Sequence, residues 1–239
     1  TKTGRTDRVV VVGAHLDSVP EGPGINDNGS GSATTLEIAL QMAASGVEPE
    51  NQVRFAFWGA EEAGLVGAEH YVTNLAAREL KNIALNLNFD MLGSPNYVRF
   101  VYDGDGSDGT AGPNGSGRIE RVFTDYFASQ GLATEPTAFD GRSDYGPFIA
   151  AGIPAGGLFS GAEGIKTADE AAAYGGSAGD PYDPCYHQAC DDIDNLSDAA
   201  LDELGDAAAH AVLVFAETQS AVNGTARSAG VDVETVAGG

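Results

Sequence analysis

Runs of apolar residues that are typical of β-strands recur along the chain. The run RVVVVGA at 8–14 is apolar after its first residue and predicts a strand buried on both faces of a parallel or mixed sheet. Segments 52–58 and 83–90 alternate apolar and polar residues, which predicts two further strands. The segments YVRFVY at 97–102 and GIPAGGLFSG at 152–161 predict two more.

Apolar residues at helical spacing fill the sequence between and after these runs. They predict helices at 32–45, 61–75, 119–127, 167–174 and 201–217. Strands that alternate with helices are typical of an α/β fold. We expect a three-layer sandwich with a central mixed, mostly parallel sheet flanked by helices.

Length and composition favour one domain followed by a tail. The 239 residues are 42% hydrophobic, which is enough for one sizeable core. Residues 1–219 carry the pattern of the domain, whereas 220–239 lack any pattern and are predicted to be a C-terminal tail. The glycine- and aspartate-rich segment 103–117 predicts a long surface loop, because it lacks the glycine and glutamate positions of a calcium loop.

The charge balance excludes some classes of partner. There are 35 acidic and 12 basic residues, which gives a formal net charge of −23. Such an acidic chain is a poor ligand for nucleic acid or for an anionic membrane. No apolar run is long enough to cross a bilayer, so we expect a soluble protein.

Cysteine occurs only at Cys185 and Cys190, close together in the segment CYHQAC. Two nearby thiols in a chain without other cysteines favour one disulfide and an oxidising, extracellular compartment. Zinc binding by this pair alone is less favoured, because structural zinc usually takes four ligands. The expected localisation is therefore secreted.

Side chains that can bind metals follow three of the predicted strands. His15 follows the first strand, Glu61 and Glu62 follow the second, and Asp90 ends the third. Each has an ordinary explanation when it is taken singly, such as a turn former or a helix N-terminus. In open α/β sheets, however, functional groups collect beyond the carboxyl ends of the strands. Together these residues predict a metal site.

Six ordered motifs carry a resemblance to a known family. They are GAHLDS, GINDNGSG, WGAEE, NFDM, GRSDYGPF and CYHQACD, spread over most of the chain. The set resembles the M28 metallopeptidases, in particular the secreted bacterial zinc aminopeptidases of the Streptomyces type. The resemblance implies that 1–219 is a peptidase catalytic domain. Members usually have an N-terminal helix and one or two strands before the first strand seen here, so we expect a longer precursor with a cleaved N-terminal fragment or a protease-associated domain.

The resemblance also implies a pair of zinc ions. His15 and Asp90 would hold one ion, Glu62 and His187 would hold the other, and Asp27 would bridge them. A hydroxide between the ions would attack the peptide bond. Two zinc ions, three carboxylates and one hydroxide give a neutral cluster, which can be partly buried.

Further roles follow from the same resemblance. Glu61 would be the general base, while Tyr186 and Arg142 would assist at the oxyanion. The Asp17 carboxylate would orient the imidazole of His15. Phe159 would line a pocket for an apolar side chain. Tyr145 stands where related enzymes often carry histidine.

Asp202 and Asp206, one turn apart on the last predicted helix, would contribute to a calcium site.

The implied activity is release of N-terminal, large apolar residues from peptides, with carboxylates such as Glu61 and Asp90 recognising the free amine. Two alternatives remain. One is a carboxypeptidase or deacylase on the same dinuclear frame, which would need Arg142 to anchor a substrate carboxylate. The other is a receptor-like domain without catalysis.

Overall fold

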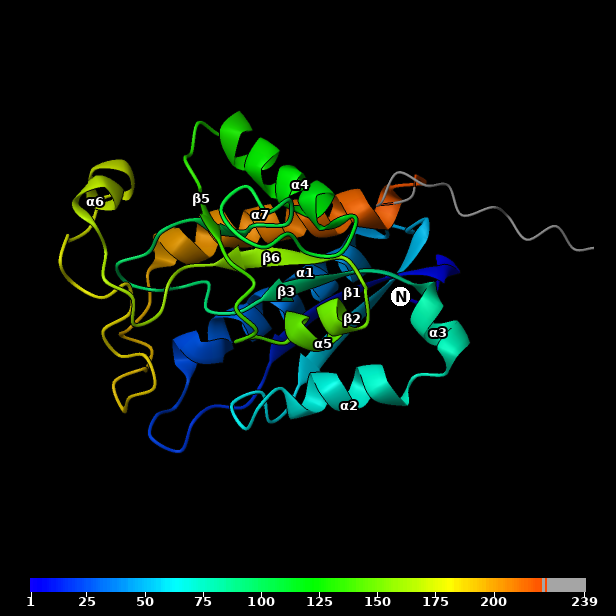
Figure 1. Cartoon of the computed structure of the whole chain (residues 1–239), viewed down its shortest axis with the longest axis horizontal. Helices are drawn as coiled ribbons and strands as arrows, with labels where there is room; N and C mark the ends of the chain where they lie inside the picture. Colours follow the sequence, from blue (N-terminus) through cyan, green and yellow to red (C-terminus); the bar gives the residue numbers. More distant parts are fainter. Residues whose placement is uncertain (221, 223–239) are drawn as a thin grey trace, which may run out of the picture.

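A six-stranded sheet forms the centre of the protein, as the computed structural model of residues 1–220 and 222 shows (Figure 1). The strand order is β2-β1-β3-β6-β4-β5, and only the β4–β6 pair is antiparallel. The predicted mixed, mostly parallel sheet is therefore confirmed. The strands are β1 (Arg5–His15), β2 (Asn51–Trp58), β3 (Ile83–Phe89), β4 (Phe100–Tyr102), β5 (Glu135–Thr137) and β6 (Ala155–Phe159).

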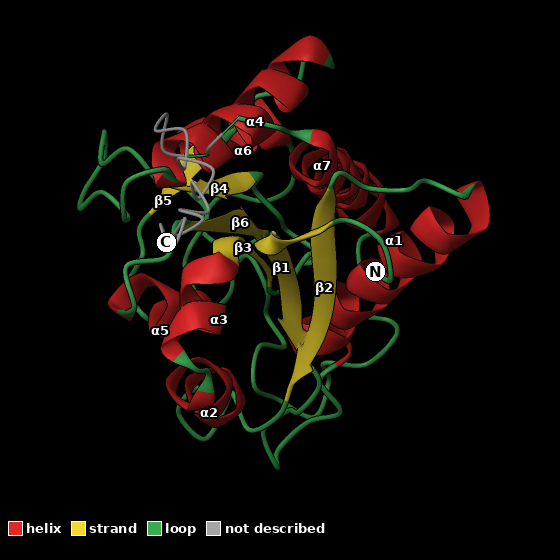
Figure 2. Ribbon diagram, turned by 90° about the vertical axis from the view of Figure 1, so that its right-hand side faces the viewer, coloured by secondary structure: helices red, strands yellow, loops and turns green. Residues whose placement is uncertain are grey.

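Helices cover both faces of the sheet, which completes the three predicted layers (Figure 2). One face carries α1 (Gly31–Ser45), α4 (Ser116–Ser129) and α7 (Asp198–Glu217). The other carries α2 (Val66–Asn74), α3 (Ala77–Asn82) and α5 (Tyr145–Ala150), while α6 (Ala168–Tyr174) lies beyond the sheet. Among the described residues, no helix has the length and apolarity to cross a membrane.

The valines of β1 explain why this strand lies in the middle of the core. Val10 and Val12 pack in the cluster formed with α1, α4 and α7, whereas Val9 and Val11 pack with Trp58 and the helices of the opposite face. All four are almost fully buried. Burial of each valine contributes about 1.5–3 kcal/mol, so a run of this kind is stable only between two helical layers.

Most predicted elements are confirmed, with three differences. The helix predicted at 61–75 begins only at Val66, because Ala60 and Leu65 both have φ of 59° and turn the chain first. The strand predicted at 97–102 is reduced to β4. The short elements α3, α5 and β5 have too few residues to show a period and were not predicted. The predicted tail, apart from 220 and 222, lies outside the described residues.

Candidate active site

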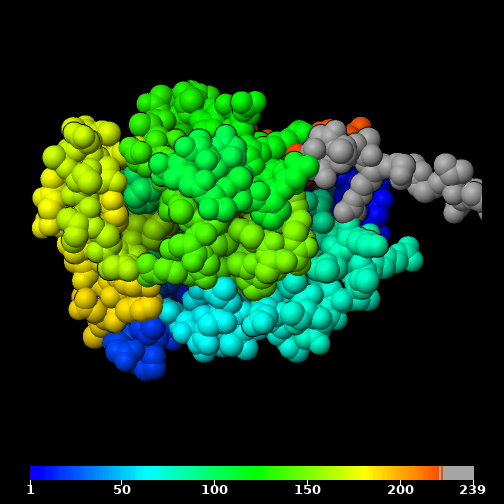
Figure 3. Space-filling view, in the orientation of Figure 1, coloured from blue at the N-terminus to red at the C-terminus, as the bar shows by residue number. Residues whose placement is uncertain are grey.

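The candidate site lies where the parallel strands β1, β2 and β3 end. His15 is the last residue of β1, Glu61 and Glu62 lie in the turn after β2, and Asp90 directly follows β3. Asp27 belongs to η1 (Ile25–Ser30), the irregular turn before α1. In Figure 3 the blue, cyan and yellow-orange segments that carry several of these residues lie side by side at the lower left.

One half of the site is formed by His15, Asp27 and Asp90. The Nε2 atom of His15 lies 3.1 Å from Oδ1 of Asp90 and 3.2 Å from Oδ1 of Asp27. The His15 side chain is 1% exposed. Two carboxylates from different segments therefore approach the same buried nitrogen of His15.

The other half is formed by His187 and Glu62, and His187 contacts the second carboxylate oxygen of Asp27, Oδ2. Nε2 of His187 lies 3.1 Å from Asp27 Oδ2 and 3.0 Å from Glu62 Oε2. Each carboxylate oxygen of Asp27 thus faces a different histidine. The residues predicted as metal ligands are all brought together, with Asp27 between the two halves.

Charge in this cluster is strongly perturbed. Burial lowers the pKa of His15, but Asp90 and Asp27 outweigh it and raise the pKa to about 12. Burial raises the pKa of Asp27, but the two histidines outweigh it and the pKa is lowered. Burial and the nearby Asp27 raise the pKa of Glu62 to about 7. The cluster therefore stabilises positive charge among its carboxylates.

The donor atoms fit divalent metal ions. Nδ1 of His15 lies 3.1 Å from the main-chain oxygen of Asp17, a contact that places a proton on Nδ1. Nε2 is then free to direct its lone pair toward a cation that it shares with the carboxylates. Nε2 of His187 lies close to two carboxylate oxygens but makes no hydrogen bond of good geometry with them, and Oε1 of Glu62 is buried without a hydrogen-bond partner. A bound cation would supply a partner to both atoms.

Asp17 acts through its backbone as well as its side chain. Its main-chain oxygen is closer to His15 Nδ1 than its carboxylate is, since Oδ1 lies 3.8 Å away. The carboxylate instead accepts hydrogen bonds from the backbone N–H groups of Glu61, at 3.0 Å, and Glu62, at 3.3 Å. Asp17 thereby links His15 to the turn that carries both glutamates.

A cavity of about 290 Å³ opens beside the cluster. Glu61 lines it and is only 8% exposed, and burial together with the nearby Asp90 raises the pKa of Glu61 to about 9. A bound cation would lower this pKa by favouring the carboxylate. The cavity is lined by the acidic Asp27, Glu61, Glu62, Asp90 and Asp140, by apolar residues that include Leu65, Met91, Tyr102 and Phe159, and by Arg142 and Tyr186.

Arg142 and Tyr186 form the polar side of the cavity. Nη2 of Arg142 donates to the Tyr186 hydroxyl over 3.1 Å, and the Tyr186 ring stacks on His187 with centroids 3.8 Å apart. The hydroxyl of Tyr145 donates to the Asp140 carboxylate over 2.8 Å. The Asp140 carboxylate also accepts from the backbone N–H of Arg142. A tyrosine at 145 therefore fixes the turn that presents Arg142.

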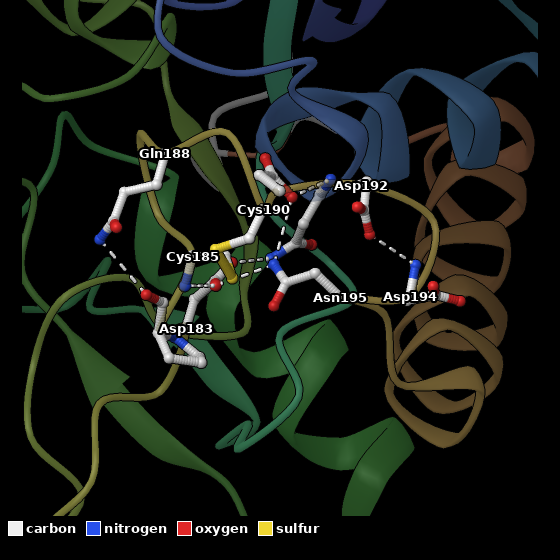
Figure 4. The surroundings of a disulfide bond; sticks show 10 residues. Asp183, Cys185, Gln188, Cys190, Asp192, Asp194 and Asn195 are labelled. Atoms are coloured by element: carbon white, nitrogen blue, oxygen red, sulfur yellow. Dashed lines mark hydrogen bonds between the residues drawn. A yellow bond between two sulfur atoms is a disulfide. The ribbon is translucent and has the colours of Figure 1, made fainter.

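A hydrogen-bond network holds the bridging residue in place. The Asp191 carboxylate accepts from the backbone N–H groups of Asn26, at 2.9 Å, and Asp27, at 3.0 Å. Asp183 accepts from the side chains of Asn26 and Asn195, and Figure 4 shows Asp183 and Asn195 beside the disulfide. The loop that carries His187 is thus tied to the loop that carries Asp27.

The predicted disulfide is confirmed and closes that loop. Cys185 and Cys190 are joined (Figure 4), and His187 lies between them in the sequence. Replacing both cysteines by serine should lower the free energy of unfolding by about 2 kcal/mol, because so short a ring restricts the unfolded chain only modestly. Urea unfolding of the variant and of the wild type measures the difference. A loss above about 4 kcal/mol would contradict this estimate of loop-closure entropy.

Several residues of the site were not predicted from the sequence. Ser143 donates to Asp90 over 2.5 Å and accepts from Asn88 over 2.7 Å, so it fixes the orientation of that ligand. Asp144 is 1% exposed, neither of its carboxyl oxygens has a hydrogen-bond partner, and burial and Asp90 raise its pKa to about 8. Both belong to the motif GRSDYGPF, as Asp191 belongs to CYHQACD. The motifs contain these residues, but the contacts that the residues make join distant parts of the sequence. The motifs alone therefore do not predict these contacts.

Other acidic groups lie away from the site. Asp202 and Asp206 are exposed on α7, and within the described residues no third acidic or histidine ligand groups with them. Their role in a calcium site stays a prediction. Carboxylates of Asp103, Asp105 and Glu120 come close together in the predicted surface loop and at the start of α4, where all three accept backbone N–H groups.

Comparisons with known proteins agree with this geometry. A model of peptidase family M28 matches residues 1–212. An aminopeptidase of Pseudomonas aeruginosa is 59% identical over 210 residues, which are 87% of this chain and 39% of that protein. Leupeptin-inactivating enzyme 1 of Streptomyces exfoliatus is 50% identical over 210 residues, which are 87% of this chain and 45% of that enzyme.

The fold is similar to that of a zinc aminopeptidase from Bacillus subtilis, with a TM-score of 0.71 and 29% identity. The match covers 92% of this chain and 49% of the Bacillus chain. The chain thus spans less than half the length of each of these relatives. The resemblance read from the six motifs is confirmed, and the match of the family model over most of the chain shows that the chain belongs to peptidase family M28.

Proposed function

We propose that residues 1–219 form the catalytic domain of a dinuclear zinc aminopeptidase. The observation that carries the proposal is the position of Asp27, whose two carboxylate oxygens each face a different histidine, while each histidine also contacts a second carboxylate. His15 and Asp90 would hold one ion, Glu62 and His187 the other. The names of the Pseudomonas and Bacillus relatives support the activity and the metal. Zinc bound there would polarise the scissile carbonyl and make water a nucleophile near neutral pH.

The chain supplies the proton transfers and the oxyanion contact. Glu61 lines the cavity next to the ligand Glu62, where it can take a proton from the attacking water and deliver it to the leaving amine. The Tyr186 hydroxyl accepts from Arg142, so its own proton is available to the carbonyl oxygen as that oxygen gains charge. Burial and Asp27 raise the pKa of Tyr186, which keeps the hydroxyl protonated.

The charges around the cavity favour recognition of an amine rather than a carboxylate. Asp27, Glu61, Glu62 and Asp90 line it, and they suit the positive N-terminus of a peptide. The apolar wall, which includes Leu65, Met91 and Phe159, suits a large apolar side chain. A secreted enzyme is supported by the disulfide.

A carboxypeptidase or deacylase is less well supported. It would need Arg142 to bind a substrate carboxylate, but both terminal nitrogens of this guanidinium already donate to Glu163, at 2.9 and 3.2 Å. A receptor-like domain would have no need for a complete ligand set beside Glu61. The geometry therefore favours the aminopeptidase.

Hydrolysis of Leu-p-nitroanilide tests the proposal. We expect the chain to cleave it, to lose at least about 90% of the rate after dialysis against a chelator, and to regain the rate when zinc is restored. N-acetyl-Leu-p-nitroanilide, which lacks the free amine, is the matched control and should not be cleaved. Equal cleavage of the blocked substrate would contradict an aminopeptidase, and an unchanged rate after chelation would contradict the metal.

A further inference from the structure

The guanidinium of Arg142 is held by a carboxylate from outside the catalytic cluster. Nη1 donates to Oε1 of Glu163 over 2.9 Å and Nη2 donates to Oε2 over 3.2 Å, which is a two-point ion pair. Nη2 also donates to the hydroxyl of Tyr186. The side chains of Arg142 and Glu163 are 54% and 57% exposed. The pair is therefore open to solvent and to a bound substrate.

This ion pair lies at the edge of the cavity. Arg142 lines the cavity, and so does Ala162, the neighbour of Glu163 in the chain. Arg142 is the basic residue in that lining, and the other charged groups there are carboxylates. A peptide whose amine lies among Glu61 and Asp90 would extend its remaining residues from the cluster toward the edge. The sign of the charge at the edge then affects which peptides bind.

Glu163 neutralises Arg142 without fixing it rigidly. Exposed ion pairs are weak, typically worth well under 1 kcal/mol or at most about that much. Glu163 is nevertheless part of the same chain, and a group tethered this closely has an effective concentration in the millimolar range. The carboxylate of a bound peptide must therefore compete with Glu163 for the guanidinium of Arg142.

We propose that Glu163 is a specificity-determining residue that keeps Arg142 from selecting peptides with a carboxylate next to the cleaved bond. Dipeptides are the main substrates of that kind, because their C-terminal carboxylate follows the bond by one residue. With Glu163 in place, the enzyme cleaves a longer or amidated peptide with a kcat/KM similar to that for a dipeptide. The inference rests on the aminopeptidase function proposed above.

The test compares two substrates that differ only in this carboxylate. In the Glu163→Gln variant the amide oxygen can still accept from Arg142, but the positive charge is no longer neutralised. The ratio of kcat/KM for Leu-Gly to that for Leu-Gly-amide should rise about three- to fivefold relative to the wild type, and the rise should shrink in high salt. The kcat/KM for Leu-Gly-amide itself reports whether the variant is folded.

Two controls separate this role from a general effect of charge. Glu37→Gln makes the same change on the exposed face of α1 and should leave the ratio at its wild-type value. Adding Arg142→Gln to Glu163→Gln should abolish the rise, because the carboxylate then has no cation to meet. An unchanged ratio in Glu163→Gln, or an equal rise in either control, would overturn the inference. A wild-type chain that cleaves neither Leu-p-nitroanilide nor Leu-Gly-amide would instead contradict the proposed aminopeptidase.

Discussion

The Glu61→Gln variant will lose about a thousandfold in kcat for Leu-p-nitroanilide and will keep its bound zinc. Glutamine has nearly the same shape but cannot accept the proton of the attacking water, and general base catalysis is typically worth about 10²–10⁴. Glu61 lies near His15 and Asp90 but makes no ion pair with either histidine, so the four residues proposed as ligands beside Asp27 stay in place when Glu61 is replaced. Steady-state kinetics and metal analysis of the same preparation measure the two effects.

Glu69→Gln is the matched control for this variant. Glu69 is exposed on α2, shortly after the turn that carries Glu61, and its replacement removes the same charge. We expect wild-type kinetics from it. If Glu61→Gln kept more than about a tenth of the wild-type kcat, Glu61 would not be the general base. If it lost its zinc, Glu61 would be acting as a ligand.

Asp27→Asn will lose activity by a comparable or larger factor, but by a different route. An amide offers one neutral oxygen and one NH₂ group, which has no lone pair for a metal, so residue 27 could then contact one ion at most. The lost support for the metal pair is worth several kcal/mol, which is about a thousandfold in rate. Metal analysis should therefore find zinc reduced together with kcat.

The control is Asp125→Asn, an identical change at an exposed position of α4. It should retain both zinc and activity. Circular dichroism of the two variants checks that the sheet and helices are intact. An Asp27→Asn protein with full zinc content and wild-type kcat would show that Asp27 does not bridge the metals.

The central fold could be predicted because burial imposes a repeating pattern on long elements. The four valines of β1 face two helical layers, and helices on both faces of the sheet bury all of them. Where the turn before α2 overrides the helical pattern, the cause is the positive φ at Ala60 and Leu65. Apolar spacing does not encode such backbone angles, so the start of this helix was misplaced.

The candidate site could be predicted in part, for a similar reason. His15, the two glutamates and Asp90 follow strands, so the strand pattern alone places them at one edge of the sheet. His187 lies in an irregular loop, and only the resemblance to the family indicated it. The ion pair of Arg142 with Glu163 and the contact of Asp191 with Asp27 join distant segments, and no local pattern reports such pairs.

The separation of the proposed ligands along the chain has a further consequence. His15 and His187 are 187 − 15 = 172 residues apart, and the segments between them include five of the six strands. The two proposed ions would each bind ligands from distant segments of the folded chain and would have no comparable sites in the unfolded one, so they would contribute to the free energy of folding. Metal occupancy and folding would then be linked equilibria. Loss of the ions would destabilise both the strand ends and the loop closed by the disulfide, in addition to abolishing catalysis.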